Sequence, residues 1–402
     1  MLSSKFIKFM KALNSGKVEN LSCVVNLGRV GLRMAEEYST RFDLLEIEQC
    51  LFLSQFQTPA IEKSEKHLLQ LIKKHDPIFS LMEYYDNYPY SYSDINYFFK
   101  GCLKSGVEIS IKAVNPVTKH NYFKTLLKLE KSLKFYNFFM PWLDKKYKVN
   151  EILKDLEKHS LEKFNLINEI RFTKNMEEYL SQYKKFSFLK RVRFPKIYSY
   201  LSSNNTVVSE FIYGDYFYDL LHCKQLQYKD VLDLIKIQLF FMLKVGVFYN
   251  NLHSGNLIMN DEKKIYFLDC NAISILIPEL RVNLLAILEA ITKGDFEKLA
   301  HSFNNMSQEK LSKETIDKLI INLKYSFSTD LIQSNGYIIK FMKLFKVASN
   351  HGVIFDNAIF SIFKSFIYFN KLIEKTKSKN TSFENDFKII LAELKEIIKK
   401  NK

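Results

Sequence analysis

The pattern of apolar and polar positions divides the chain into a helical start, a mixed middle section and a mostly helical remainder. Apolar residues recur at helical spacing through residues 1–75, which predicts a helical leader. Residues 84–97 break that spacing with Pro89 and a high density of Tyr, Ser and Asp, which indicates a loop or the beginning of a sheet. Residues 98–103 and 107–114 then read as the two strands of a β-hairpin.

Helical spacing returns after this hairpin and dominates the rest of the chain. Residues 123–183 read as helix with a break near Pro141, and residues 206–212 read as a strand. Further helices are expected over 216–248, 278–303, 314–347, 354–375 and 383–400. Together these elements predict an α+β fold with two lobes.

One stretch, residues 246–271, interrupts the second helical section. Residues 257–259 and 265–268 are short apolar runs joined by a polar turn, so they are expected to form two paired strands. Asn256 comes directly before the first strand and Asp269 directly after the second. Polar side chains at neighbouring strand ends are expected to lie close together, which makes this stretch the candidate site.

The spacing of these polar residues is typical of a protein-kinase catalytic loop. In such loops a general base lies five residues before a metal-binding Asn, and a metal-binding Asp follows on the next strand pair. Position 251 is five residues before Asn256, and Asp269 follows in that context. Their amide and carboxylate oxygens suit Mg²⁺. Asn251 cannot accept a proton near pH 7, so the spacing predicts a kinase-type site that lacks its base.

Lys112 lies inside the predicted strand 107–114, between apolar neighbours. It is the candidate for the strand lysine that contacts the α- and β-phosphates of ATP and pairs with a helix Glu. The alternative is an edge-strand lysine that faces solvent, and the downstream stretch favours the first interpretation. Glu169 and Glu162, seven residues apart on one helix face, are the candidate partners; an ordinary surface Glu is the alternative for each.

Two further residues have a functional and a structural interpretation. Glu210, just before Gly214, is a candidate for the hinge where a nucleotide base meets the backbone, or else an ordinary strand end. His253 either orients the backbone of the loop or is a packed histidine. No GxGxxG sequence precedes Lys112, so a glycine-rich phosphate loop is not expected.

Composition indicates a large core and a basic surface. The chain has 402 residues, of which 47% are apolar and 15% aromatic, and its formal net charge is +15. Such a charge is compatible with phosphate-bearing ligands, anionic membranes or nucleic acid, although biased genome composition explains it equally well. We expect no nucleic-acid partner, because the sequence contains no compact basic and aromatic patch. The five isolated cysteines indicate a reducing compartment.

No segment of the sequence reads as a membrane span. The longest candidate, residues 231–248, contains Asp233, Lys236 and Lys244. Residues 1–17 are basic and weakly amphipathic but lack the apolar region of a signal peptide. We therefore expect a cytoplasmic protein; peripheral contact of this first helix with a membrane is the alternative to an ordinary surface helix.

With these residues identified, the chain resembles the UbiB/AarF-type atypical kinases over roughly residues 25–385. The family's leader motif, KxGQ followed by STRPDLL, is similar to residues 33–36 and 39–45. Its Ala-rich loop AAASIGQV is similar to 91–98, and its strand VAVKV to 109–113. Residues 192–198 resemble the family motif VRVPKVY, and residues 209–214 resemble MEYIDG. Residues 249–256 resemble HADxHPGN, and residues 267–271 resemble LxDFG. A helical feature that follows these motifs in the family resembles residues 294–303.

The chain also departs from the family at positions that matter for catalysis. The Ala-rich loop has gained Tyr and Asp, which would crowd or repel phosphate. In the leader motif, Arg33, Ala35 and Glu36 replace the family's Lys, Gly and Gln. Asn251 replaces the catalytic Asp, and Cys270 and Asn271 replace the Phe and Gly of DFG. The set that remains, Lys112, Asn256 and Asp269 with a helix Glu, suits nucleotide and metal binding better than phosphoryl transfer.

The resemblance implies a two-lobed protein-kinase-like fold with an N-terminal helical extension. Its expected parts are the extension at 1–75, a small lobe at 76–213 and a helical lobe at 214–402. Family members act as ATPases or kinase-like regulators in isoprenoid quinone biosynthesis or lipid homeostasis, often at membranes. The resemblance therefore implies ATP and Mg²⁺ as ligands with weak transfer activity. The alternative is an inactive pseudokinase that binds a protein partner or a lipid surface.

Overall fold

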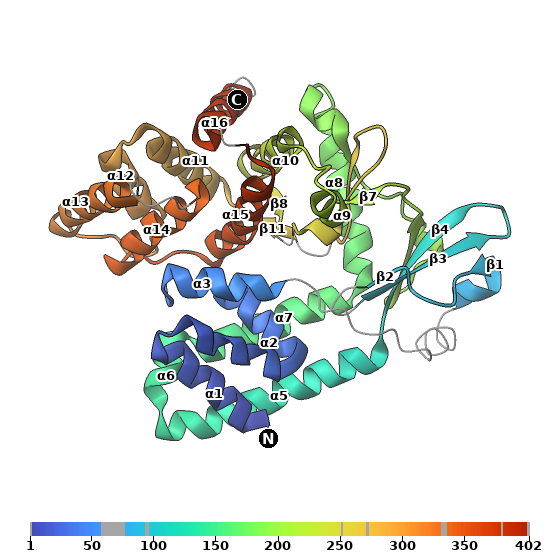
Figure 1. Cartoon of the computed structure of the whole chain (residues 1–402), viewed down its shortest axis with the longest axis horizontal. Helices are drawn as coiled ribbons and strands as arrows, with labels where there is room; N and C mark the ends of the chain where they lie inside the picture. The colour runs from blue at the N-terminus through green and yellow to red at the C-terminus, as the bar shows by residue number, and fades with distance from the viewer. Residues whose placement is uncertain are drawn as a thin grey trace.

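The computed structural model describes residues 2–57, 77–92, 96–250, 252–270, 273–330, 336–378 and 381–399. A small lobe built on an antiparallel sheet faces a larger, mostly helical lobe, and an N-terminal helical layer packs beside both (Figure 1). The predicted two-lobed α+β architecture with a helical extension is confirmed.

The described N-terminal extension consists of three α-helices and two 3₁₀ segments. Its elements are α1 (Leu2–Ser15), η1 (Val18–Leu27), α2 (Gly28–Tyr38), α3 (Ile47–Leu53) and η2 (Ser54–Gln57). Helix α2 packs closely on η1 at Gly31, where a Cβ atom would lie 2.1 Å from the Val24 carbonyl oxygen. The remainder of the predicted leader, residues 58–75, lies outside the described residues.

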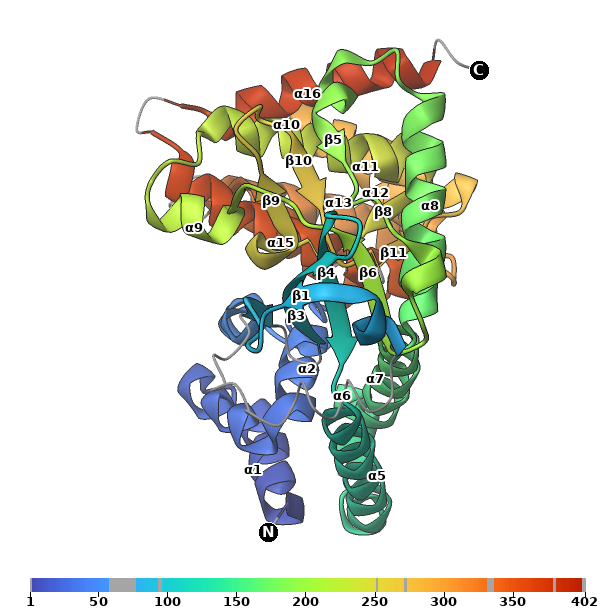
Figure 2. The same cartoon turned by 90° about the vertical axis from the view of Figure 1, so that its right-hand side faces the viewer.

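Three helices that follow the first hairpin complete this layer. They are α5 (Pro116–Phe139), α6 (Pro141–Tyr147) and α7 (Val149–Phe164), and they pack against α1 and α2 (Figure 2). Proline at the first position of α6 marks the predicted break. The apolar face of α1, which carries Phe6 and Phe9, is buried in this layer and is therefore not available to a bilayer.

The sheet of the small lobe places Lys112 at its centre. The strand order is β1 (Met82–Tyr85), β3 (Asn96–Leu103), β4 (Glu108–Val114) and β6 (Thr206–Glu210), with β2 (Ser91–Tyr92) also on β3. Lys112 is paired with Phe98 on one side and Val207 on the other. Because β4 has a neighbour on both sides and Lys112 is buried, the alternative of a solvent-facing edge lysine is excluded.

A helix break that the sequence pattern did not predict separates the two candidate glutamates. Asn165 caps the N-terminus of α8 (Leu166–Gln182) by accepting a hydrogen bond from the Ile167 amide. Glu162 therefore belongs to α7 and is exposed, whereas Glu169 lies in the first turn of α8 and is buried. The expected single helix face for the two residues is wrong.

The helical lobe surrounds two small sheets. One contains β5 (Val192–Arg193), β10 (Ile265–Phe267), β9 (Leu257–Met259) and β7 (Asp215–Tyr216), and the other pairs β8 (Val247–Tyr249) with β11 (Ile273–Ile275). The helices are α9 (Phe217–His222), α10 (Tyr228–Phe240), α11 (Pro278–Lys293), α12 (Phe296–Met306), α13 (Lys313–Asp330), α14 (Tyr337–Asn350), α15 (Asn357–Thr376) and α16 (Phe383–Lys399). The helix expected over 278–303 ends at Gly294, whose φ of 68° closes α11.

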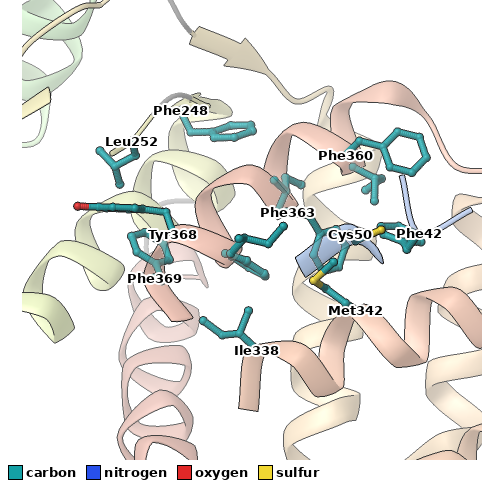
Figure 3. Close-up of a cluster of buried hydrophobic side chains, with 14 of the residues drawn as sticks. Phe42, Cys50, Phe248, Leu252, Ile338, Met342, Phe360, Phe363, Tyr368 and Phe369 are labelled. Carbon is teal, nitrogen blue, oxygen red and sulfur yellow. The ribbon is translucent and has the colours of Figure 1, made fainter. Parts of the chain in front are cut away.

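The hydrophobic core joins the extension to the helical lobe. Phe42, just after α2, contacts the rings of Phe345 and Phe363 at centroid distances of 5.8 and 4.9 Å. Figure 3 shows Phe42 and Cys50 against Met342 and Phe363 of the helical lobe. All five cysteines are free. Among the described helices, none is both long and apolar enough to cross a membrane.

Candidate nucleotide site

Lys112 holds together three segments that are far apart in the sequence. Its Nζ atom lies 2.6 Å from Oε2 of Glu169 on α8 and 2.5 Å from Oδ1 of Asp269, which follows β10. The expected pairing with a helix Glu and an additional ion pair with Asp269 thus meet at one buried ammonium group.

The β9–β10 hairpin positions the two oxygen donors of the candidate metal site. Phe267 pairs with Leu257, and the next amide, that of Leu268, donates to the Asn256 carbonyl oxygen at 2.9 Å. This register places Asn256 directly beside the residue that precedes Asp269. Asp269 has a φ of 56°, a left-handed conformation that Asp tolerates better than most residues. The turn of the backbone brings its carboxylate to Lys112.

The charges in this cluster are strongly coupled. Burial raises the pKa of the Asp269 carboxyl, but the Lys112 ammonium and the charge of Lys163 oppose this and hold it well below its usual range. Burial and the neighbouring Asp269 charge raise the pKa of Glu169. Burial lowers the pKa of Lys112, but the two carboxylates outweigh it and the net shift is upward. At neutral pH the site therefore contains a charged lysine beside an ionised Asp269.

A cleft between the lobes leads to this cluster. It has a free volume of about 130 Å³. Its apolar wall consists of Phe98, Pro195, Ile197, Val207, Phe211, Ile212, Ile258, Phe267 and Leu268. The Tyr90 ring lies 5.4 Å from the Phe211 ring, and its hydroxyl is 2.8 Å from the Ser110 Oγ atom. The free volume of the cleft is smaller than the roughly 300 Å³ or more that small-molecule sites usually enclose.

Glu210 lies in the cleft wall at the hinge between the lobes. Its carboxylate Oε1 accepts a hydrogen bond from the Lys196 amide at 2.9 Å, and its own amide donates to the Lys196 carbonyl. The side chain is thus used to join β6 to the segment after β5. The carboxylate of Glu210 is therefore occupied, and only the backbone at this position is suited to contacting a nucleotide base.

Sequence reasoning missed two residues that line the cleft, Ser110 and Thr173, and gave Cys270 only as the replacement for the family's DFG Phe. Ser110 lies two residues before Lys112 on the same strand face, so strand alternation was the signal that could have found it. Cys270 is 2.7 Å from the Tyr249 hydroxyl and also contacts Thr173 on α8. Burial raises the pKa of the Cys270 thiol to about 12, so this residue is a packing contact that holds α8 against the Asp269 segment.

The loop before β9 is described only in part. Asn251 and Asn271 lie outside the described residues. His253 Nδ1 accepts a hydrogen bond from the Gly255 amide at 3.2 Å, and burial lowers the pKa of the imidazole. His253 therefore supports the backbone of the loop, which agrees with the first of its two interpretations.

Asp269 in the cleft and Asn256 at the neighbouring strand end are the candidate magnesium ligands. No cluster of three or more His, Cys, Asp or Glu side chains that could bind a metal occurs among the described residues. Mg²⁺, however, needs only one or two protein oxygens when phosphates and water supply the others. Asp269 supplies an ionised carboxylate, and Asn256 lies at the neighbouring strand end, so the two residues have the kinds of oxygen atom that Mg²⁺ takes.

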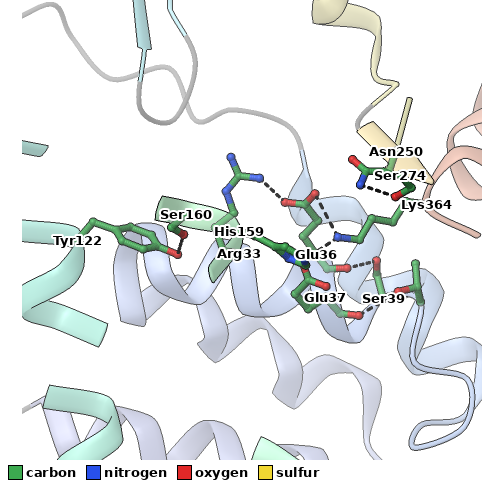
Figure 4. A network of polar contacts seen from close by, with 11 residues as sticks. Arg33, Glu36, Glu37, Ser39, Tyr122, His159, Ser160, Asn250, Ser274 and Lys364 are labelled. Carbon is green, nitrogen blue, oxygen red and sulfur yellow. Dashed lines mark hydrogen bonds and ion pairs between the residues drawn. The ribbon is translucent and has the colours of Figure 1, made fainter. Parts of the chain in front are cut away.

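A second, half-buried ionic network ties the leader motif to the helical lobe (Figure 4). Arg33 pairs with Glu36 at 2.6 Å, and Lys364 on α15 pairs with Glu37 at 2.7 Å. Burial raises the pKa of Glu37, but the Lys364 ammonium outweighs it and lowers that pKa to about 2. The residues that replace the family's leader motif thus form structural ion pairs.

The two lobes, the lysine between two acids and the Asn–Asp pair at the strand ends define a protein of the kinase-like class. The model of the ABC1 atypical kinase-like domain matches residues 55–303, more than half of the chain. The chain belongs to this family, and the resemblance to UbiB/AarF-type kinases is confirmed.

Individual relatives are distant. An Arabidopsis thaliana chloroplastic protein described as an uncharacterized aarF domain-containing protein kinase is 21% identical over 73% of this chain and 59% of its own. A probable protein kinase UbiB from Blochmanniella pennsylvanica is 27% identical over 39% of this chain and 29% of its own. A solved Mycobacterium tuberculosis protein in complex with erythromycin aligns with 89% of this chain and 91% of its own, with 12% identity and a TM-score of 0.48. The chain thus spans less than two thirds of the curated relatives' length.

Proposed function

We propose that this protein binds ATP with Mg²⁺ in the cleft between its lobes and transfers phosphoryl groups weakly or not at all. The observation that carries the proposal is the buried Lys112, held by Glu169 at 2.6 Å and by Asp269 at 2.5 Å at the inner end of an apolar cleft. A buried and a half-buried acid around one buried lysine are costly to maintain for stability alone. A role for Lys112 in binding phosphates explains why the two acids are placed around it.

Each residue has a defined part in this proposal. Lys112 contacts the α- and β-phosphates, and Glu169 orients the Lys112 side chain. Asn256 and Asp269 would ligate Mg²⁺, which supplies charge neutralisation at the phosphates. The hinge at Glu210 would lie beside the base of the nucleotide.

Position 251 limits the activity. Asn251 cannot act as a general base, although it could align a water molecule or hydroxyl group. The transition state of phosphoryl transfer is largely dissociative, so catalysis depends mostly on positioning and charge neutralisation. Slow ATP hydrolysis is therefore the expected activity. Isoprenoid quinone or lipid metabolism is the setting that the family resemblance supports.

The test is calorimetric titration of the protein with ATP, with and without Mg²⁺. We expect binding that depends on Mg²⁺ in the wild type and is at least about tenfold weaker in Asp269→Asn, since the variant loses a charged oxygen ligand. Glu262→Gln, which removes a carboxylate in the exposed β9–β10 turn, is the matched control. Absence of binding at millimolar ATP would overturn the proposal.

The second candidate is a pseudokinase that acts as a scaffold. Asn251, the Tyr and Asp residues in the Ala-rich-loop equivalent, and the small free volume of the cleft favour it. Asn251→Asp distinguishes the two functions in a protein that binds ATP. A gain in ATPase activity supports the weak enzyme, whereas a folded variant that binds ATP without any gain supports the scaffold.

A further inference from the structure

Helix α5 exposes apolar side chains on the face opposite the one that it buries. Tyr122, Leu126, Leu129 and Leu133 are buried against the N-terminal layer. Leu127, Phe135 and Phe138 lie on the other side of the helix and are 51, 61 and 83% exposed. At the end of the helix Phe139 is 63% exposed, and Trp142 follows at the start of α6 with 47% exposure. A folded protein rarely leaves so many aromatic rings together in water.

Lysines surround these aromatic side chains. Lys124, Lys128, Lys131 and Lys134 are exposed on the same side of α5 at helical spacing. Within the described part of the chain none of them forms an ion pair. The single acidic residue of α5, Glu130, lies toward Glu157 of α7, whose charge together with burial raises the pKa of Glu130. The exposed face of α5 is therefore apolar and positively charged, without an acid.

The neighbouring helix α1 is also basic on its exposed side. It packs on α5, with a contact of 2.8 Å between the hydroxyls of Ser3 and Ser132. Lys5, Lys8 and Lys11 of α1 are exposed, and α1 contains no Asp or Glu. Figures 1 and 2 place α1, α5 and α6 at the edge of the molecule, away from the sheets that line the cleft.

We propose that the exposed face of α5, with the aromatic residues at the α5–α6 turn, is a docking surface for an anionic lipid bilayer. Aromatic side chains are favoured at the level of the lipid headgroups, and lysines beside them are attracted to anionic lipids. The rings of Phe135, Phe138 and Phe139 enter the boundary between headgroups and acyl chains. This inference does not depend on nucleotide binding.

Nucleic acid is the other polyanion that a basic aromatic surface can bind. The premise from the sequence that the chain lacks a compact basic and aromatic patch is wrong, because α5 gathers one. The patch nevertheless fits lipid better. Phe139 packs against Phe135 and Phe138 at centroid distances of 5.4 and 5.1 Å in tilted and edge-to-face geometry, so the three rings form one apolar cluster and not a row of parallel faces on which successive bases could stack. Residues 116–147 also contain no arginine.

The chain contains its own probe for this interaction, since Trp142 is its single tryptophan. The full chain is titrated with vesicles of phosphatidylcholine alone, or with about 30% phosphatidylglycerol, while tryptophan emission and vesicle flotation are recorded. We expect a blue shift and flotation with the anionic vesicles only, quenching by lipids brominated on the acyl chain, and weaker binding at high salt.

The variant Phe135→Glu/Phe138→Glu should bind anionic vesicles at least about tenfold more weakly, because two charges would enter the apolar boundary. The matched control is Ile321→Glu/Tyr325→Glu on α13, where two residues four positions apart are 67 and 70% exposed. Circular dichroism establishes that both variants are folded. The proposal is overturned if the wild type binds neither vesicle, if the control loses binding equally, or if a single-stranded oligonucleotide shifts Trp142 emission and the vesicles do not.

Discussion

At the scale of single residues, the most consequential feature is that one buried lysine neutralises two carboxylates. The Lys112 ammonium lies between Glu169 and Asp269, and their side chains are only 8 and 15% exposed. Removal of a partner from a buried ion pair costs more than the pair contributes, because an uncompensated charge remains. The lysine is therefore required for stability as well as for the proposed ligand.

We expect Lys112→Met to lower the free energy of unfolding by about 3 kcal/mol at pH 7. The loss should shrink as the pH falls, since protonation of Glu169 and Asp269 removes the uncompensated charge. Urea denaturation at pH 7 and pH 5 measures both effects, with Lys100→Met, which breaks the more exposed Lys100–Glu108 ion pair of β3 and β4, as the control. A variant as stable as the wild type would show that the two acids find other partners.

The ionised Glu37 side chain makes the stability of the folded protein depend on pH in the acidic range. Its pKa in the folded protein is about 2, against an ordinary value of 4.5, because Lys364 outweighs the effect of burial. A lowered folded pKa contributes stability above pH 4.5, and this contribution is lost as the pH falls toward 2. We expect Glu37→Gln to flatten the decline of the melting temperature over this interval. An unchanged pH profile in the variant would contradict the role assigned to this ion pair.

At the scale of elements, the sequence located strands better than it located the ends of helices. The hairpin of β3 and β4 and the strands β9 and β10 follow from alternation and turn residues. The break at Asn165 was missed because apolar spacing continues across it from Phe164 to Leu166. Helix α5 is apolar on two faces, and the sequence alone does not say which face meets the core. Pairing of β8 with β11 depends on tertiary contacts that periodicity does not contain.

The cap of α8 is expected to matter for the site. Asn165→Ala removes the acceptor for the Ile167 amide and should cost about 1 kcal/mol of stability. Because Glu169 lies in the first turn of this helix, fraying should also weaken Mg²⁺–ATP binding in calorimetry. Asp295→Ala removes the equivalent cap of α12, where Asp295 accepts from the Lys298 amide, and is the control. Equal effects of both variants on binding would argue against a local role for the α8 cap.

At the scale of the whole molecule, the extension and the helical lobe form one structural unit. Phe42 contacts the rings of four C-terminal phenylalanines: Phe345, Phe355, Phe360 and Phe363. Lys346 donates to the Leu45 carbonyl at 3.1 Å, and Lys371 to the Ser54 carbonyl at 2.7 Å. The sequence predicted the two lobes and the extension but could not predict this union, which joins residues some 300 positions apart.

Phe42→Ala should lower the free energy of unfolding by about 3–5 kcal/mol, because it opens a cavity at this shared core. If extension and helical lobe unfold together, Trp142 fluorescence and circular dichroism should report the same urea midpoint, in the wild type and in the variant. Phe138→Ala removes an equal ring from an exposed position and should cost little. A Trp142 transition at lower urea than the loss of helix would mean that the extension unfolds separately.

The position of Phe42 also sets the order in which the protein can fold as it is made. The aromatic partners of Phe42 begin at Phe345, so a ribosome adds about 300 further residues before the first partner exists. At 5–20 residues per second, this interval lasts about 15–60 s. Throughout it, the side of the extension that carries Phe42 and Cys50 has nothing to cover it. The nascent chain is therefore expected to depend on chaperones until its last third emerges.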